Sequence, residues 1–311
     1  MFDKEKNFIS AIVYIHNCED SIQEFLKALG SKLEENFEHS EIICVNDFST
    51  DQSVQRIKDF RPGHSNVSIT VLNMSYFHGL ELSMNAGLDI SIGDFVFEFD
   101  STSLDYDISE IMNVYRKSQE GYDIVALSPD SGNGLFSSLF YKTFNHFASF
   151  QYKLSSESFR ILSRRVINRI GSMSKTIPYR KAVYANSGLK TTRLFYKREC
   201  GTVHPIDRSE KKFRRHLAFD SLVLFTDVGY KFSIYMALTM IGVAVAMLVY
   251  SVVIYITCNP IEGWTTTILF LSFAFFGLFS VLTVIIKYLQ ILIELIFKRK
   301  SYCFESIEKL T

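Results

Sequence analysis

A carboxylate follows a short apolar run in the segment GDFVFEFDSTSLDYD, residues 93–107. The run Phe95 to Phe99 is aromatic and β-branched and is bounded by a Gly-Asp turn and a Ser/Thr/Asp cluster, which is typical of a buried strand. Asp100 comes directly after it. Because the carboxyl ends of the strands line the ligand crevice of an open α/β sheet, an acid there is well placed to meet a metal ion or a phosphate-bearing ligand. The alternative is that Asp100 caps a turn.

Two earlier apolar runs also end in polar clusters. The first reads IVYIHNCED over residues 12–20 and contains His16 and Asn17, and the second reads EIICVNDFSTD over residues 41–51 and contains Asn46 and Asp47. A lone histidine such as His16 is more often a hydrogen-bonded structural residue than a ligand. Asp51 is best interpreted as the cap of the following helix, since its side chain can accept from free N–H groups there.

The elements that carry these clusters alternate between strand and helix patterns over roughly residues 1–205. Strands are expected at residues 8–15, 41–45, 67–72 and 95–99, and helices at residues 21–33, 53–60 and 80–90. This βαβα order predicts an α/β fold with a mostly parallel, doubly wound sheet. In such a sheet the three polar clusters lie at one edge.

Composition narrows the class of function. Lysine plus arginine and aspartate plus glutamate number 33 each, so the net charge is zero and nothing in it favours a nucleic-acid partner. The five cysteines are scattered without a C-x-x-C pair, which excludes the usual zinc spacings and a disulfide-rich scaffold. We therefore expect the cysteines to be reduced.

Two long apolar stretches predict a membrane anchor. Residues 232–257 and 265–286 carry no charged side chain, and each exceeds the roughly 20 residues needed to cross a bilayer. Basic residues precede the first stretch and follow the second, so the positive-inside rule places both flanks in the cytoplasm. The N-terminus has no signal peptide pattern, because its first apolar run is too short. We expect a multi-pass protein of the cell inner (plasma) membrane with a cytoplasmic catalytic domain.

The segments around the two spans are predicted to lie at the membrane surface. Residues 206–230 begin with the basic run KKFRRH and continue with apolar residues, which favours an amphipathic helix on anionic membrane lipids. Residues 288–311 are expected to form a cytoplasmic tail. Within the tail, residues 289–297 have helical apolar spacing and are interpreted as a second interfacial helix or a contact in a homo-oligomer.

Taken together, these segments resemble the family 2 glycosyltransferases of the GT-A fold. That family usually has V-P-x-Y-N-E-E, then a D-D-x-S-x-D turn, then a D-x-D after the fourth strand. Two further matches are the segment NAGLDISIGD, residues 85–94, and the segment SFRILSRR, residues 158–165, which is similar to the family's D-F-R-L element. With its two spans, the chain looks most like the polyprenyl-phosphate (bactoprenol) glycosyltransferases, relatives of dolichyl-phosphate mannose synthase.

The resemblance implies a hexosyltransferase that moves a sugar from a nucleotide-sugar donor to a polyprenyl (undecaprenyl-type) phosphate, with inversion. A divalent ion, Mg²⁺ or Mn²⁺, would bridge the donor phosphates. The roles that it implies are catalysis by Asp100 and Arg160, nucleotide binding by Asn17, Asn46, Asp47 and Arg164, and metal binding by Asp100 and Thr102. Both arginines also have a simpler interpretation as solvated helix charges.

The chain departs from the family pattern at the ion site. Thr102 stands where the second aspartate of D-x-D is usual, and a hydroxyl is a much weaker ligand for Mg²⁺ than a carboxylate. Glu98, on the same face by strand alternation, and Asp105, in the loop beyond, are the two candidates to compensate. Two other functions therefore stay open. One is transfer to a membrane-linked saccharide or glycolipid, and the other is a catalytically impaired relative that binds a nucleotide sugar or a protein.

Overall fold

The structure is a computed structural model of the full chain. It describes residues 4–60, 66–130, 135–147, 152–173 and 179–198, isolated positions between 216 and 292, and the strand at 304–310. By contacts the chain divides into two units, one made of Met1–Ala218 with Arg299–Thr311 and the other of Phe219–Lys298. The first unit therefore extends beyond the predicted catalytic domain of residues 1–205 and takes in the end of the chain.

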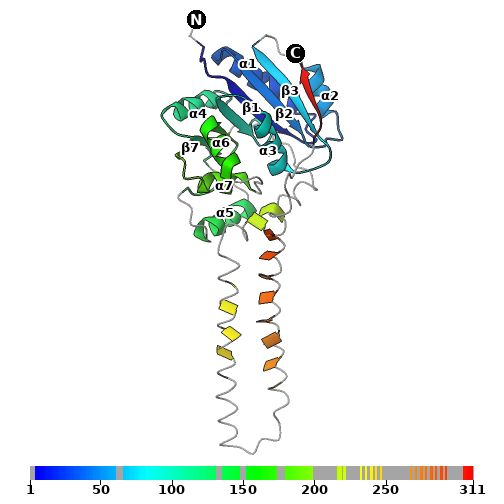
Figure 1. Ribbon diagram of the computed structural model, residues 1–311. Helices are drawn as coiled ribbons and strands as arrows, with labels where there is room; N and C mark the ends of the chain where they lie inside the picture. Colours follow the sequence, from blue (N-terminus) through cyan, green and yellow to red (C-terminus); the bar gives the residue numbers. More distant parts are fainter. Residues whose placement is uncertain are drawn as a thin grey trace, which may run out of the picture. The chain divides into compact units, whose positions relative to one another are not determined.

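One eight-stranded sheet organises the described part of the first unit, in the order β7-β5-β6-β4-β1-β2-β3-β8 (Figure 1). Its strands are β1 (Ile9–Ile15), β2 (Ser40–Asn46), β3 (Val67–Met74), β4 (Phe95–Phe99), β5 (Ile124–Pro129), β6 (Phe159–Ser163), β7 (Thr191–Tyr196) and β8 (Phe304–Leu310). The helices between them are α1 (Ile22–Asn36), α2 (Ser53–Asp59), α3 (Leu80–Ile90), α4 (Glu110–Gln119), α5 (Leu135–Phe147), α6 (Arg164–Met173) and α7 (Arg180–Asn186).

The sheet is mostly parallel, as the alternating pattern predicts. Strands β4, β1, β2 and β3 run parallel as neighbours, and β5 pairs with β7 in parallel. The exceptions are β6, which is antiparallel to β4 and β5, and β8, which is antiparallel to β3. An antiparallel strand within or at the edge of such a sheet is common in large α/β folds.

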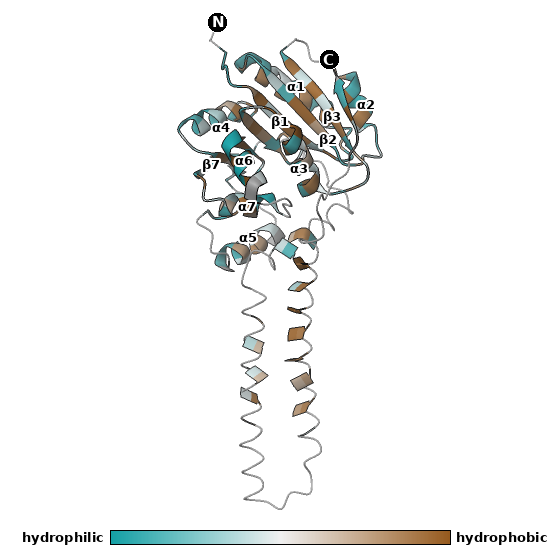
Figure 2. Cartoon of the chain, viewed as in Figure 1, coloured by the Kyte–Doolittle hydropathy of each residue, from teal (hydrophilic) through white to brown (hydrophobic). Residues whose placement is uncertain are grey.

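Two hydrophobic cores cover the two faces of the sheet. Along β1, Ala11 and Val13 belong to the core that also contains residues of α1, α2 and α4, whereas Ile12 and Tyr14 belong to the core with α3, α6 and α7. Successive side chains of a strand point to opposite faces, so β1 is buried on both sides. Figure 2 shows the matching hydrophobic colour along the central strands. The result is a three-layer α/β/α unit.

Helix α3 lies unusually close to the sheet. A Cβ atom added at Gly87 would lie 2.6 Å from Cγ2 of Ile12 and 2.9 Å from Cγ2 of Val45. Any larger residue at this position would therefore push the helix away from β1 and β2. This close approach sets the distance between α3 and strands β1 and β2.

The end of the chain forms a strand, which the sequence did not predict. Strand β8, red in Figure 1, pairs with β3 over the partners Ile69 to Met74 and Leu310 to Phe304. The prediction of a separate tail over residues 288–311 is therefore corrected for residues 304–310. The strand has no strong alternation of large apolar residues, and only its pairing with β3 makes it recognisable.

The predicted membrane segments fall largely outside the described residues. Most of 206–230, 232–257, 265–286 and 289–297 belongs to the part of the chain that the structure does not describe. Among the residues that it does describe, no helix has the length and apolar character needed to span a membrane. The membrane hairpin and the two interfacial helices accordingly stay predictions.

Candidate functional site

The three polar clusters meet at one edge of the sheet. Strands β4, β1 and β2 are adjacent and parallel, so their carboxyl ends lie side by side. Asp100 follows β4, Asn17 follows β1, and Asn46 is the last residue of β2. This confirms the expected layout of the edge and brings together residues that are far apart in the sequence.

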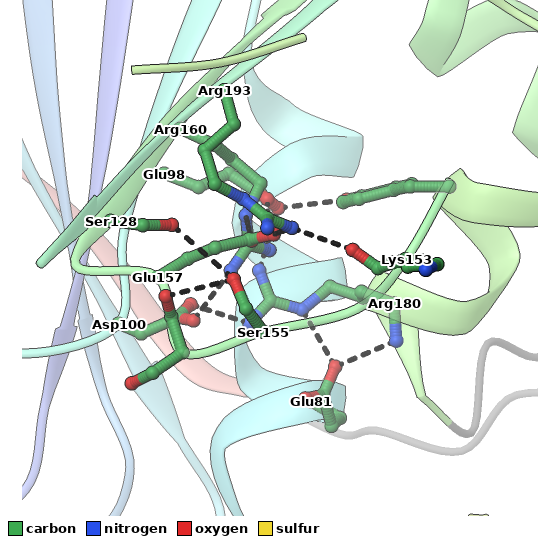
Figure 3. Close-up of polar contacts among 12 residues, drawn as sticks. Glu81, Glu98, Asp100, Ser128, Lys153, Ser155, Glu157, Arg160, Arg180 and Arg193 are labelled. Atoms are coloured by element: carbon green, nitrogen blue, oxygen red, sulfur yellow. Dashed lines mark hydrogen bonds and ion pairs between the residues drawn. The ribbon is translucent and has the colours of Figure 1, made fainter. Parts of the chain in front are cut away.

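Two buried arginines hold Asp100 (Figure 3). Arg160 Nη2 donates to Asp100 Oδ2 and Arg180 Nη2 donates to Oδ1, each over 2.7 Å. Arg160 comes from β6, the antiparallel neighbour of β4, and Arg180 is the first residue of α7. Both arginine side chains are at most 1% exposed, whereas that of Asp100 is 13% exposed. Asp100 is therefore the most exposed of these three side chains.

Glu98 lies beneath Asp100 and binds the same two arginines. Its Oε2 accepts from Arg160 Nη1 over 2.9 Å, and its Oε1 accepts from Arg180 Nη1 over 2.6 Å. The hydroxyl of Tyr184 also donates to Oε1, over 3.0 Å. Because successive strand residues alternate between faces, Glu98 and Asp100 point the same way, and the arginines span both.

A third carboxylate completes the contacts of each arginine. Glu157 accepts from Arg160 Nε over 3.1 Å, and Glu81 accepts from both the backbone N–H and Nε of Arg180. We call the set Glu81, Glu98, Asp100, Glu157, Arg160 and Arg180 the arginine–carboxylate cluster. Each arginine thus contacts three carboxylates, and loss of either one would leave buried charges without a partner, which is strongly destabilising.

The cluster keeps Asp100 ionised. Burial by itself would raise the pKa of Asp100, but Arg160 and Arg180 outweigh it and hold that pKa well below its ordinary value. Burial would lower the pKa of each arginine, yet the surrounding carboxylates raise both well above the ordinary range. An ionised carboxylate in fixed orientation can accept hydrogen bonds from a ligand or bind a cation.

Asp47 lies at the edge as predicted, but it faces the protein. Its Oδ1 accepts from the backbone N–H of His78 over 2.8 Å, and its Oδ2 accepts from Gly79 N–H over 2.7 Å and from the Tyr14 hydroxyl over 3.0 Å. Gly79 has a φ of 81°, a conformation that glycine adopts without strain. Asp47 is fully buried. The predicted hydrogen bond from Asp47 to a nucleotide would therefore require the segment containing His78 and Gly79 to move away from its carboxylate.

Asn46 and Asn17 hold the turn that follows β2. Asn46 Oδ1 accepts the backbone N–H of Ser49 over 3.0 Å, and Asn17 Oδ1 accepts the backbone N–H of Thr50 over 2.8 Å. We call residues 46–50 the β2 turn. His16 also binds it, since its Nδ1 donates to the carbonyl oxygen of Asp47 over 2.7 Å. This confirms a structural role for His16, and Asp51 has its expected capping role because its Oδ1 accepts the N–H of Ser53.

Arg164 has a structural contact in place of a free guanidinium. Its Nε and Nη2 both donate to the carbonyl oxygen of Gly93, with a distance of 2.8 Å for Nε. Gly93 precedes β4, and a Cβ atom added to it would be 2.5 Å from the backbone nitrogen of Ser10. Arg164 therefore anchors the segment before β4, at the opposite end of that strand from Asp100.

The sequence matches the Glycosyl transferase family 2 domain over residues 10–174, which is more than half of the chain. The chain belongs to glycosyl transferase family 2. The matched residues include strands β2 to β6 and all of β1 except Ile9, and therefore the Asn46, Asp100 and Arg160 positions.

Several proteins named as glycosyltransferases are similar to this chain along much of its length. Uncharacterized glycosyltransferase YkcC of Bacillus subtilis is 23% identical over 270 residues, 83% of this chain and 81% of that protein. Uncharacterized glycosyltransferase sll0501 of Synechocystis sp. is 28% identical over 199 residues, 61% of each chain. A prophage bactoprenol glucosyl transferase homolog of Escherichia coli is 28% identical over 196 residues, 61% of this chain and 63% of that protein.

A solved glycosyltransferase has the same fold. Mannosyltransferase PcManGT from Pyrobaculum calidifontis, in complex with GDP-Man and Mn²⁺, superposes with a TM-score of 0.51 at 14% identity, over 89% of this chain and 88% of its own. At that identity the likeness shows the fold alone. It supports the GT-A type of α/β sheet that the sequence predicts.

In this family 2 chain, the residues predicted for a divalent ion do not fit one. Both oxygens of Asp100 accept from arginines, and Thr102 is buried with its Oγ1 2.6 Å from Ser21 Oγ. Glu98 is fully buried inside the cluster, and Asp105 pairs with Arg198 at 3.3 Å. Among the described residues no group of three or more His, Cys, Asp or Glu side chains could hold a metal. Neither candidate compensates for Thr102.

Four members of the site are absent from our sequence-based prediction, namely Arg180, Glu81, Tyr184 and Glu157. Arg180 and Tyr184 bind Asp100 or Glu98 directly, Glu81 binds Arg180, and Glu157 binds Arg160. Arg180 and Tyr184 lie in α7, beyond the segments that resemble the family. One feature of the sequence could have indicated that such partners exist. Glu98 lies within an apolar strand, and a carboxylate buried there requires cationic partners.

Proposed function

We propose that this family 2 member transfers a sugar from a nucleotide-sugar donor to a polyprenyl phosphate at the cytoplasmic face of the cell membrane. The observation that carries the proposal is the position of Asp100, which two arginines hold ionised at the same sheet edge as the β2 turn. The name of the Escherichia coli relative, a bactoprenol glucosyl transferase homolog, favours this acceptor class.

In this proposal Asp100 orients the donor. Its carboxylate is fixed by the arginine–carboxylate cluster and is partly exposed, so it can accept hydrogen bonds from sugar hydroxyl groups. A fixed group aimed at the reacting centre costs no reorganisation during the reaction. The β2 turn, which Asn46 and Asn17 hold by hydrogen bonds to Ser49 and Thr50, offers an edge for the nucleotide. Arg160 acts through Asp100 in this arrangement, because its guanidinium is buried in the cluster.

The proposed acceptor matches the lack of an obvious general base. A polyprenyl phosphate is already an anion at neutral pH, so it attacks without proton removal, unlike a sugar hydroxyl. Asp100 is a poor base because its pKa is held well below the ordinary value. This argues against transfer to a hydroxyl of a membrane-linked saccharide or glycolipid, the first alternative acceptor.

The membrane hairpin completes the proposal. Strand β8 pairs with β3, so the chain that leaves the first unit after Ala218 returns to it by Arg299. If the predicted spans cross the membrane an even number of times, the chain returns to the side on which the first unit lies. The apolar segments at 232–257 and 265–286 would then anchor the catalytic unit at the surface where a lipid-linked phosphate resides.

One observation favours a second candidate function, that of an impaired relative that only binds. Thr102 replaces the usual second acid and is turned to Ser21, so the divalent ion predicted from the resemblance, Mg²⁺ or Mn²⁺, has no protein site in the described residues. A nucleotide-sugar complex without transfer would be the signature of this candidate.

Lipid extraction tests the proposed function directly. Membranes containing the full chain are incubated with radiolabelled nucleotide sugars, with and without added undecaprenyl phosphate, and the organic phase is counted. We expect label in a phosphate-linked lipid with the wild type and background counts with Asp100→Asn. Donor binding without any labelled lipid would overturn transfer and favour the binding role.

A further inference from the structure

We propose that strand β8 positions the β2 turn through Asn73, which makes Asn73 a positioning residue for the nucleotide-sugar donor. The inference deepens the proposed function, because it rests on the β2 turn being part of the donor site. It concerns residues that neither the sequence motifs nor the arginine–carboxylate cluster includes.

A row of three side chains crosses the sheet from β8 to β2. Asn73 of β3 is paired in register with Asn46 of β2 on one side and with Ser306 of β8 on the other. Asn46 Nδ2 donates to Asn73 Oδ1 over 2.9 Å, and Asn73 Nδ2 donates to Ser306 Oγ over 2.9 Å. The two asparagines are less than a tenth exposed, so water cannot readily replace these contacts.

Glu308 selects the orientation of the Asn73 side-chain amide. Its Oε1 accepts from Asn73 Nδ2 over 3.4 Å, and its Oε2 is 2.6 Å from Lys58 Nζ of α2. An ionised carboxylate only accepts hydrogen bonds, so Glu308 favours the amide orientation in which the Asn73 nitrogen faces β8. The Asn73 oxygen then faces β2 and accepts from the nitrogen of Asn46.

The amide orientation of Asn46 decides the state of the β2 turn. With its nitrogen turned to Asn73, its Oδ1 is available to accept the N–H of Ser49 over 3.0 Å. Ser49 in turn accepts the backbone N–H of Asn17 over 3.2 Å, which links the turn to the end of β1. Reversing the amide of Asn73 would present a donor to Asn46 and would break this sequence of contacts.

Strand alternation supplies matched controls. Ser306 and Glu308 share the side of β8 that faces Asn73, whereas Ile307 and Lys309 project to the other side and are exposed. A substitution at Lys309 therefore perturbs the same strand without touching the row. Comparing this control with substitutions in the row distinguishes a positioning role of the row's side chains from a general effect of disturbing the sheet edge.

The test combines donor kinetics with amide exchange of the full chain. Asn73→Leu keeps the approximate size but removes both the oxygen that accepts from Asn46 and the nitrogen that donates to Ser306. We expect its KM for the nucleotide sugar to rise about tenfold, equivalent to about 1.4 kcal/mol, with kcat and the KM for the lipid acceptor within about twofold of wild type. Amide hydrogen exchange at Ser49 should quicken in the free protein, and Lys309→Ala should match wild type in every measurement.

The result that overturns the inference is wild-type exchange at Ser49 in Asn73→Leu. If that variant does not fold, Ser306→Ala combined with Glu308→Gln decides in the same way, because both changes lie at a sheet edge. The exchange measurement needs no substrate. A wild type that transfers no sugar would therefore refute the proposed function while leaving this inference to be judged by exchange alone.

Discussion

Arg180 and Asp100 are 80 positions apart in the chain, yet Nη2 of the arginine lies 2.7 Å from Oδ1 of the aspartate. Arg160 takes the other oxygen at the same distance. Asp100 is therefore held from two directions, by a helix on one side and by an antiparallel strand on the other. A carboxylate held at both oxygens in this way is restrained from rotating, so its orientation is set before any ligand arrives.

Truncation of Arg180 should destabilise the protein. Arg180→Ala leaves Glu81, Glu98 and Asp100 without one cationic partner, and breaking a buried ion pair typically costs about 3 to 5 kcal/mol. Urea denaturation of the full chain in detergent measures the free energy of unfolding. The matched control is Arg165→Ala, because that side chain is 70% exposed and should change the free energy by less than about 1 kcal/mol. Equal effects of the two substitutions would contradict a structural role for the cluster.

Arg160→Lys should lower transfer while the protein stays folded. A lysine keeps the charge, but a single ammonium cannot reproduce three N–H groups aimed at Glu157, Glu98 and Asp100. We expect kcat to fall at least about tenfold, as when a charge-assisted hydrogen bond of about 1.5 to 3 kcal/mol is lost. Steady-state kinetics with a circular dichroism check of folding provide the measurement. If Arg160→Lys had the turnover of the wild type, the role of Arg160 would be structural only.

Acid should weaken the fold partly through Asp100. Its pKa in the folded protein is held well below the ordinary value of about 3.9, so its ionised form contributes stability that is fully present above the unfolded-state pKa. That contribution is lost as the pH falls below about 4 toward the folded-state pKa. Urea midpoints between pH 7 and pH 3 should therefore decline less steeply for Asp100→Asn than for wild type. Parallel curves would show that Asp100 is not the responsible group.

The sequence predicts the parallel half of the sheet well because local patterns determine it. Helix α3 and strand β4 have the predicted bounds, and Asp100 lies at a strand end as expected. The partners of Asp100 depend on contacts between distant segments, which no local pattern contains. Arg180 was missed for this reason, and Arg164, predicted to bind phosphate, binds the Gly93 carbonyl.

The same limit applies to Asp47 and to the end of the chain. The turn motif correctly places Asp47 at the end of β2, but only the fold shows that His78 and Gly79 bind its carboxylate. Strand β8 is recognisable only through its pairing with β3. Motif order therefore predicts where a site lies more reliably than which way each side chain points.

Divalent ions should bind the free protein poorly. The Asp100 oxygens accept from arginines and Thr102 is buried against Ser21, so an Mn²⁺ ion finds few ligands without the donor phosphates. Isothermal titration of Mn²⁺ should show weak binding alone and stronger binding with nucleotide sugar present. Tight binding to the free wild type would mean that an acid outside the described residues completes a site.

The pairing of β8 with β3 also fixes the sidedness of the chain end. Residues of β8 must lie on the same side of the membrane as the sheet, so the predicted spans must cross an even number of times. Two single cysteines test this in a background without the native ones: Lys309→Cys on β8 and Lys27→Cys on α1, both at exposed positions. An impermeant maleimide should label neither in intact cells and both in inverted membrane vesicles. Labelling of Lys309→Cys alone from outside intact cells would contradict both the hairpin and the pairing of β8 within the sheet, since a strand across the membrane cannot hydrogen-bond to β3.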